Sequence, residues 1–248
     1  MKKLSLIGRR TYHYNDNIVI NIPVLRHIRG DNFKDETMFW KDVNLFTQTP
    51  SDMISELHSV GVDFEELTDY DLFVFLFMTR QKMEDNDCKS LLFHNLDFNK
   101  LQVAILEEQN KPVLVDENGQ IIIDENIYND ISEIITSITG RQKTKKKKFG
   151  NAFAKKKRIE QDYKVKEKMR NRESDDTSVL DGIILRLVCN TNFPYNFETI
   201  QDVTIYDLVH SLKQIEKDIQ VSDLMQSRLV GNDLTKLPQE QLSRFISF

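Results

Sequence analysis

Apolar residues at every second position between Tyr12 and Ile22, and short continuous apolar runs later in the chain, predict β-strands. The alternating positions surround the turn-forming triplet at residues 15–17, and Pro23 limits the second strand to an edge position. The clearest hairpin joins apolar runs at residues 113–115 and 121–123 through Asn118-Gly119, because Asn-Gly supplies the positive φ angles of a tight turn. Two further runs, at 91–93 and 101–105, are candidate strands.

Helical spacing of apolar residues predicts most of the remaining structure. Residues 34–60 are predicted to be helical, with a new helix starting at Pro50 after Thr49 and ending at Gly61. A helix with five isoleucines at helical spacing, ending at Gly140, is predicted after the hairpin. An amphipathic helix is expected after residue 178, followed by a helix-rich tail that Gly231 breaks.

The segment from Leu72 to Met78 is apolar almost all round. Thr68 is a suitable N-cap, and Asp69 and Asp71 complement the helix dipole in the first turn. We therefore expect this segment to form the central helix of the N-terminal region, with a buried strand as the competing interpretation.

Residues 192–215 contain the best-defined helix start of the chain. Thr204 can cap the helix, with Asp207 three residues later. The same [LV]-T-x-Y-D-L pattern occurs at residues 67–72, which indicates either a duplicated module or the same capping chemistry used twice.

Charge divides the chain into three parts. Residues 141–172 hold fifteen Lys/Arg and three acidic residues, a local charge of +12, so the remainder of a chain with net charge −5 carries −17. We therefore predict an α+β protein: a mixed N-terminal domain with β-hairpins (1–140), a long basic helix or linker (141–175) and a helical C-terminal domain (176–248). The middle part has few apolar residues, which favours a free-standing charged helix or a disordered connector.

Motifs for catalysis, metal binding or nucleotide binding are missing from the sequence. Glycine-rich phosphate loops are lacking, and the five histidines stand without metal-ligand spacing. Cys88 and Cys189 lie far apart and are expected to be free thiols. The sequence has no run of about 18 apolar residues for a membrane span, and the N-terminal apolar stretch, Leu4 to Ile7, is too short for a signal peptide. We expect a non-enzymatic protein without a cofactor that does not enter a membrane.

The basic segment contains two clusters of cations that suit a polyanion-binding site. They are Lys145, Lys146, Lys147, Lys148, Lys155, Lys156, Lys157 and Arg158. Clustered cations release counterions from phosphates, but this segment has few aromatic residues for base stacking. Three interpretations stay open: a solvated linker, a segment that binds an acidic protein surface such as a second copy of the chain, or a nucleic-acid-binding arm.

Residues 192–215, together with the lysine-rich segment before them, resemble tail-assembly or minor structural proteins of phages that infect Gram-positive bacteria. The matching residues are Ile183 to Asn190, Phe193 to Phe197, Val203-Thr204-Ile205-Tyr206 and Leu208. The segment from Phe64 to Met78 is more faintly similar to T4-type baseplate assembly proteins.

This resemblance implies a chaperone or minor virion component that binds tail or baseplate proteins, including the tape-measure protein. Such a protein would act in the host-cell cytoplasm or stay in the virion, and a second copy of the chain, in a homo-oligomer, is a further candidate partner. The candidate partner-binding residues are Tyr206, Leu208, Leu212, Phe245 and Phe248, although core packing explains the first three equally well. The alternative function is nucleic-acid binding through residues 144–172.

Overall fold

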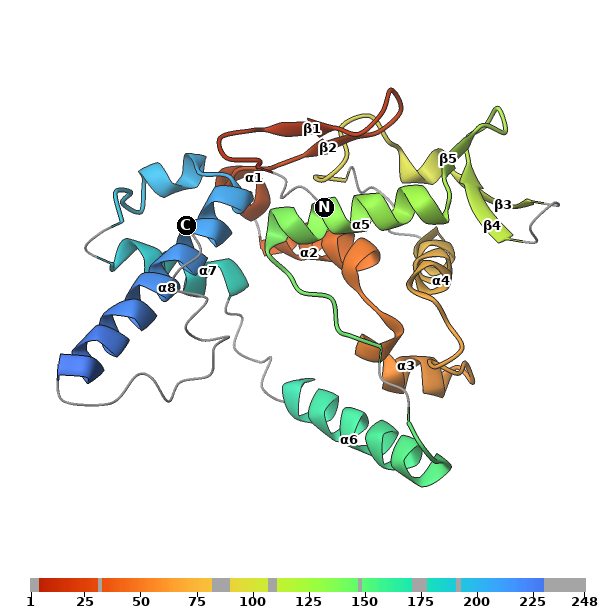
Figure 1. The fold of residues 1–248 in the computed structure, drawn as a ribbon. Helices are drawn as coiled ribbons and strands as arrows, with labels where there is room; N and C mark the ends of the chain where they lie inside the picture. The colour runs from red at the N-terminus through yellow and green to blue at the C-terminus, as the bar shows by residue number, and fades with distance from the viewer. Residues whose placement is uncertain are drawn as a thin grey trace.

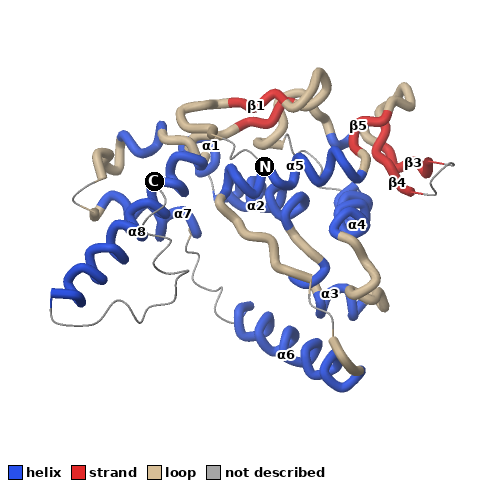
Figure 2. The backbone as a smooth tube through the Cα atoms, viewed as in Figure 1, coloured by secondary structure: helices blue, strands red, loops and turns tan. Residues whose placement is uncertain are grey.

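The computed structural model describes residues 5–30, 33–81, 90–106, 111–146, 149–170, 178–190 and 193–229. Over these residues the chain forms eight α-helices and two small antiparallel sheets, which confirms the predicted α+β class (Figures 1 and 2). The strands are β1 (Thr11–His13), β2 (Val19–Asn21), β3 (Gln102–Leu106), β4 (Lys111–Val115) and β5 (Ile121–Ile123). The helices are α1 (Leu25–Arg29), α2 (Phe33–Thr47), α3 (Ile54–Ser59), α4 (Asp69–Gln81), α5 (Glu125–Thr139), α6 (Ala152–Arg170), α7 (Val179–Val188) and α8 (Ile205–Leu229).

The N-terminal hairpin forms as predicted, with Tyr12 opposite Ile20 in the β1–β2 ladder. The Asn15 side chain accepts hydrogen bonds from the backbone N–H groups of Asn17 and Ile18, which fixes the turn. The predicted strand at 91–93 is reduced to one bridge, between Phe93 and Ile20.

The second sheet has the strand order β3-β4-β5. Its β4–β5 turn contains Gly119 at a φ of 78°, and the Asp116 carboxylate accepts hydrogen bonds from the N–H groups of Asn118 and Gln120. The Tyr70 hydroxyl of α4 donates to the Pro112 carbonyl at 2.8 Å, which fastens the sheet to the helices.

The centre of the fold is α5, which packs against α2, α4, α8 and β5 (Figure 1). Asp124 caps this helix by accepting a hydrogen bond from the Ile127 N–H at 2.8 Å, and Gly140 ends it at a φ of 65°. Tyr128 of α5 lies fully buried, with its ring centroid 4.8 Å from that of Phe73.

The segment from Leu72 to Met78 is helical, so the strand interpretation is wrong, but α4 is not the central helix either. Phe75 and Met78 are 39% and 43% exposed, while Phe73 and Phe77 are buried. The apolar run misled the prediction because only part of the circumference of α4 is covered by α2 and α5.

The C-terminal helices share the main hydrophobic core with the N-terminal region. One continuous cluster contains Phe39 and Ile131 from the N-terminal region together with Leu180, Ile205 and Leu208. The start of α8 is tied to the beginning of α1: the Leu25 N–H donates to the Val203 carbonyl, and the Ile205 N–H donates to the Pro23 carbonyl. The division into domains at residues 140 and 175 stays a prediction, but the core crosses both positions.

Capping accounts for the repeated [LV]-T-x-Y-D-L pattern. The Thr68 hydroxyl accepts from the Asp71 N–H, and the Thr204 hydroxyl accepts from the Asp207 N–H, so both threonines cap the helix that follows. Asp207 has a second role, since its carboxylate also accepts a hydrogen bond from the Gly8 N–H. The two copies therefore share helix-start chemistry but differ in their tertiary contacts.

Candidate functional site

The basic helix α6 lies apart from the main core and packs on α3 (Figure 1). The Asn151 side chain accepts a hydrogen bond from the Ala154 N–H at 2.8 Å and so starts the helix. Ile159 joins a small second apolar cluster with Ile54, Leu57, Phe64 and Leu72. The basic segment thus contains the long helix that was predicted, but this helix is docked and not free-standing.

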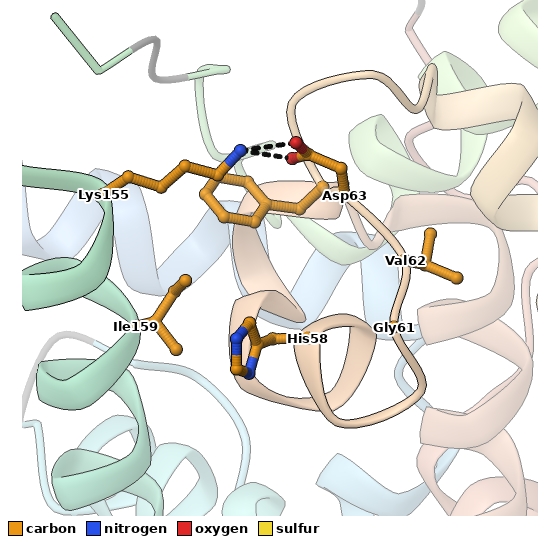
Figure 3. A pocket seen from close by; sticks show the side chains of 7 residues that line it. His58, Gly61, Val62, Asp63, Lys155 and Ile159 are labelled. Carbon is orange, nitrogen blue, oxygen red and sulfur yellow. Dashed lines mark hydrogen bonds and ion pairs between the residues drawn. The ribbon is translucent and has the colours of Figure 1, made fainter. Parts of the chain in front are cut away.

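The first anchor of α6 is Lys155, whose ammonium group lies between the carboxylates of Asp63 and Glu65; Figure 3 draws its contact with Asp63. Its Nζ atom is 2.5 Å from Asp63 Oδ2 and 2.7 Å from Glu65 Oε2, and it lies 5.2 Å from the centroid of the Phe64 ring. Hydrogen bonds to Asp63 and Glu65 raise the pKa of Lys155, and the hydrogen bond from Lys155 lowers the pKa of both Asp63 and Glu65. Lys155 is therefore a fixed cation and not a base or nucleophile at neutral pH.

The second anchor lies at the other end of α3. Lys166 pairs with Glu56 and, at 2.8 Å, with Asp162. The Asp162 carboxylate also accepts hydrogen bonds from the backbone N–H and the hydroxyl of Ser55, and the Tyr163 hydroxyl donates to the Ser55 carbonyl. Burial acts to raise the pKa of Asp162, but its hydrogen bonds with Lys166 and Ser55 outweigh burial and hold that pKa below its ordinary value.

The chain before α6 is bound to the same side of the protein. Its contacts with residues 44–69 are Arg141 to Asn44, Lys143 to Asp69, Thr144 to Asp52, Lys146 to the Leu67 carbonyl and the Phe149 N–H to Glu65. The described residues between Arg141 and Lys166 therefore contact residues 44–69 of their own chain, several of which are acidic. We call the segment from Arg141 to Lys166 the basic strap.

The structure separates the eight predicted polyanion-binding residues. Lys146 binds the Leu67 carbonyl and Lys155 binds Asp63 and Glu65, whereas Arg158 is half-buried and Lys145, Lys156 and Lys157 are exposed. Lys147 and Lys148 lie outside the described residues. Of the six described cations, two therefore have partners within their own chain and three others are exposed to solvent.

A cavity of about 300 Å³ lies between α3 and α6 (Figure 3). His58 and Ile159 face each other across it, and Asp63 and Lys155 close one end. The His58 ring also makes an edge contact with Tyr163, with ring centroids 6.2 Å apart. Among the described residues, no group of three His, Cys, Asp or Glu side chains is arranged to hold a metal ion. The contacts around this cavity are ion pairs and apolar packing that hold α6 against α3.

The predicted partner-binding residues are mostly not at the surface. Tyr206 and Leu208 are buried and Leu212 is half-buried against the main core, so core packing accounts for these three. Phe245 and Phe248 lie outside the described residues.

Sequence reasoning missed a set of exposed apolar side chains on the two helices that extend from the core. They are Phe153, Val165 and Met169 on α6, and Ile219 and Met225 on α8. The signal for Ile219 was present, because the apolar stripe of α8 continues from Leu208 through Leu212 and Ile215 with the same 3–4-residue spacing.

Comparison with protein-family models, with curated proteins and with solved structures gives no match to this chain. The similarity to phage tail-assembly proteins therefore rests on the sequence motif alone. Within the described ranges, every helix is too short or too polar to cross a lipid bilayer.

Proposed function

We propose that the chain is a non-enzymatic assembly factor of a phage tail or baseplate, acting in the host-cell cytoplasm or as a minor virion component. The sequence resemblance supports the tail or baseplate role. The observation that carries the protein-binding role is the apolar side chains exposed on α6 and on the distal part of α8. Helices that leave a core with apolar residues facing solvent are typical of interaction surfaces.

The distal half of α8 is the better-defined of the two surfaces. Leu208 is fully buried and Leu212 and Ile215 are half-buried, whereas Ile219 and Met225 are 45% and 57% exposed. The apolar stripe therefore continues to Ile219, beyond the core that covers its first part, and Met225 adds an exposed apolar side chain on another face of the same projecting end of α8 (Figure 1). A partner helix packed on this stripe would extend the same ridge-and-groove packing.

In the proposed mechanism, this surface transiently covers apolar surface on a tail, baseplate or tape-measure protein. The uneven charge of the chain guides the encounter and the apolar contacts hold the complex.

Co-purification tests this proposal. The tagged chain is co-expressed singly with the tail-tube, tape-measure and baseplate proteins of the same phage, and complexes are isolated after nuclease treatment. We expect one of these proteins to co-purify, and an Ile219→Ser/Met225→Ser variant to reduce its recovery by about tenfold, because both contacts lose buried apolar area. Ile105→Ser is the matched control, since Ile105 is 66% exposed and lies on β3, at the opposite end of the molecule from α8 in Figure 1. Recovery of none of these proteins would overturn the tail or baseplate role.

Nucleic-acid binding is the second candidate, and one observation favours it. Lys156, Lys157, Lys164 and Lys168 are exposed on α6, although Glu160 and Glu167 lie among them. A Lys156→Glu/Lys157→Glu variant leaves both anchors of the strap unchanged and is a cleaner test than deletion of residues 144–158. Nucleic-acid binding requires that the chain shift DNA or RNA in a mobility assay and that this variant abolish the shift.

A further inference from the structure

Helix α6 adds little to the hydrophobic core that it rests on. None of its described residues belongs to the main core cluster, and Ile159 is its one buried apolar side chain. The helix covers Ile54, Leu57, Phe64 and Leu72; Leu72 belongs to α4, which also packs on α2 and α5, whereas α3 packs mainly on α6. The side of α3 that carries Ile54 and Leu57 is thus an apolar surface covered by α6, and the main core does not include α6.

The ion pairs that hold α6 are partly exposed to solvent. The Lys155 and Asp63 side chains are 25% and 38% exposed, and the Lys166 and Glu56 side chains are 25% and 40% exposed. Pairs of this kind contribute little net stability and are screened by salt. The charged contacts of α6 can therefore be exchanged for equivalent contacts from another helix that carries the same groups.

The contacts of α6 define what this surface recognises. Lys155 and Lys166 are eleven residues apart, about 16 Å along a helix, and each meets carboxylates of the residue 56–65 region. Between them, Ile159 enters the apolar cluster and Asp162 binds the N-terminal turn of α3. The surface therefore fits a helix with the pattern Lys-x3-Ile-x2-Asp-x3-Lys.

We propose that this face of α3 is a receptor site for a basic amphipathic helix of a partner protein, and that α6 occupies the site in the isolated chain. Charge complementarity specifies this occupant: carboxylates lie at both ends of the site and an apolar patch lies between them. Binding of the partner helix displaces α6 and frees Lys155 and Lys166 for other contacts. The inference rests on the proposal that the chain binds other proteins, and it does not depend on which proteins those are.

A peptide supplied separately tests the exchange. A fluorescent peptide of residues 149–170 is titrated with the full wild-type chain and with a full chain carrying Lys155→Glu and Lys166→Glu, and anisotropy is followed. We expect the variant chain to bind the peptide at least about tenfold more tightly, because its own α6 no longer competes. A peptide with the same two substitutions is the matched control and is expected to bind neither chain. Equal affinity of the wild-type peptide for both chains, or no binding to either, overturns the proposal.

A charge reversal keeps the test valid if the variant chain folds poorly. This second variant of the full chain carries Asp63→Lys and Glu65→Lys. The substitutions replace the two carboxylates that bind Lys155 by lysines, so they weaken the docking of α6 without changing α6 itself. We expect this chain to bind a peptide carrying Lys155→Glu and to reject the wild-type peptide. The opposite preference, or none, contradicts the proposed recognition.

The outcome is separable from that of the proposed function. If the peptide exchanges with α6 but no tail protein is recovered, the receptor site is supported and the tail role is rejected. Recovery of a tail protein without peptide exchange keeps the tail role and rejects this site.

Discussion

Asp162 on α6 caps the start of α3 through Ser55. Its carboxylate accepts a hydrogen bond from the Ser55 backbone N–H at 3.1 Å and another from the Ser55 hydroxyl at 2.7 Å. The residue at the N-cap position of α3, Met53, provides no side-chain cap. A residue 107 positions away in the sequence therefore supplies the acceptor that an N-terminal helical N–H requires.

Replacement of this acceptor is expected to weaken both helices. Asp162→Ala should lower the free energy of unfolding by about 1–2 kcal/mol, because it removes the cap of α3 and one partner of Lys166. Urea denaturation measures the loss, and hydrogen exchange should show faster exchange at the Ser55 amide. Glu160→Ala, at an exposed position of the same helix, is the control and is expected to change stability by less than about 0.5 kcal/mol. Equal effects of the two substitutions would contradict the capping role.

The Lys155 anchor predicts a definite pH dependence. The pKa values of Asp63 and Glu65 are lowered from 3.8 and 4.5, so their stabilising contribution is present above these values and is lost as pH falls through the lower folded-state values. The pKa of Lys155 is raised from 10.5, so its contribution is present below that value and is lost as pH rises through the higher folded-state value.

Thermal unfolding of the wild type and of Lys155→Met across pH tests this dependence. The wild type should have the higher Tm by a constant margin between about pH 6 and pH 9, and the margin should shrink as pH falls below about 4.5. The variant retains every other ionisable group, so the difference in Tm isolates this anchor. A margin that persists at acid pH would mean that the Lys155 side chain acts through packing and not through charge.

Local chemistry explains which elements were predictable from the sequence. Some residue types favour one backbone conformation by themselves, so their sequence positions predict turns and helix ends. The structure has a turn at Asn118-Gly119, a helical start at Thr49-Pro50 and a helix end at Gly140. The Thr204 helix start is of the same kind.

Tertiary pairing explains what was not predictable. The sequence shows that the strap is basic, but it does not show which acidic residues the strap contacts. Lys155 pairs with Asp63, which is 92 positions away in the sequence. An acidic protein surface was among the open interpretations, with a second copy as its example; in the structure the surface belongs to the same chain. Likewise, the periodicity of α8 identifies an apolar face but does not show which part of that face the core buries. The buried Leu208 was therefore predicted as a partner contact, and the exposed Ile219 was not.

Substitutions in α8 separate core packing from partner contact. Leu208→Ala should lower the free energy of unfolding by about 2–5 kcal/mol, because Leu208 is fully buried and the truncation leaves a cavity. Ile219→Ala should change stability by less than about 0.5 kcal/mol, since Ile219 is 45% exposed. Denaturant unfolding gives both values. A large loss for Ile219→Ala would mean that the distal part of α8 packs on its own chain and is not a free surface.

Gly140 tests whether the N-terminal and C-terminal parts form one packed unit. It ends α5 at a φ of 65°, and a Cβ atom there would overlap Val209 Cγ1 of α8 and lie 2.8 Å from Lys213 Nζ. Gly119 is a matched control, because its φ is also positive, at 78°, but a Cβ atom there would meet nothing within 4 Å. Gly119→Ala should therefore show only the backbone cost, about 1–2 kcal/mol.

Gly140→Ala adds the contact with α8 to the same backbone cost. Overpacking typically costs about 1–3 kcal/mol, so the total loss should be about 2–5 kcal/mol, measured by denaturant unfolding at one pH for both variants. The excess over Gly119→Ala should disappear when Val209 is also replaced by alanine, because the overlapping Cγ1 atom is then gone. If the two glycine variants lose the same stability in the presence of Val209, then α5 and α8 do not pack as closely in solution as the shared core requires.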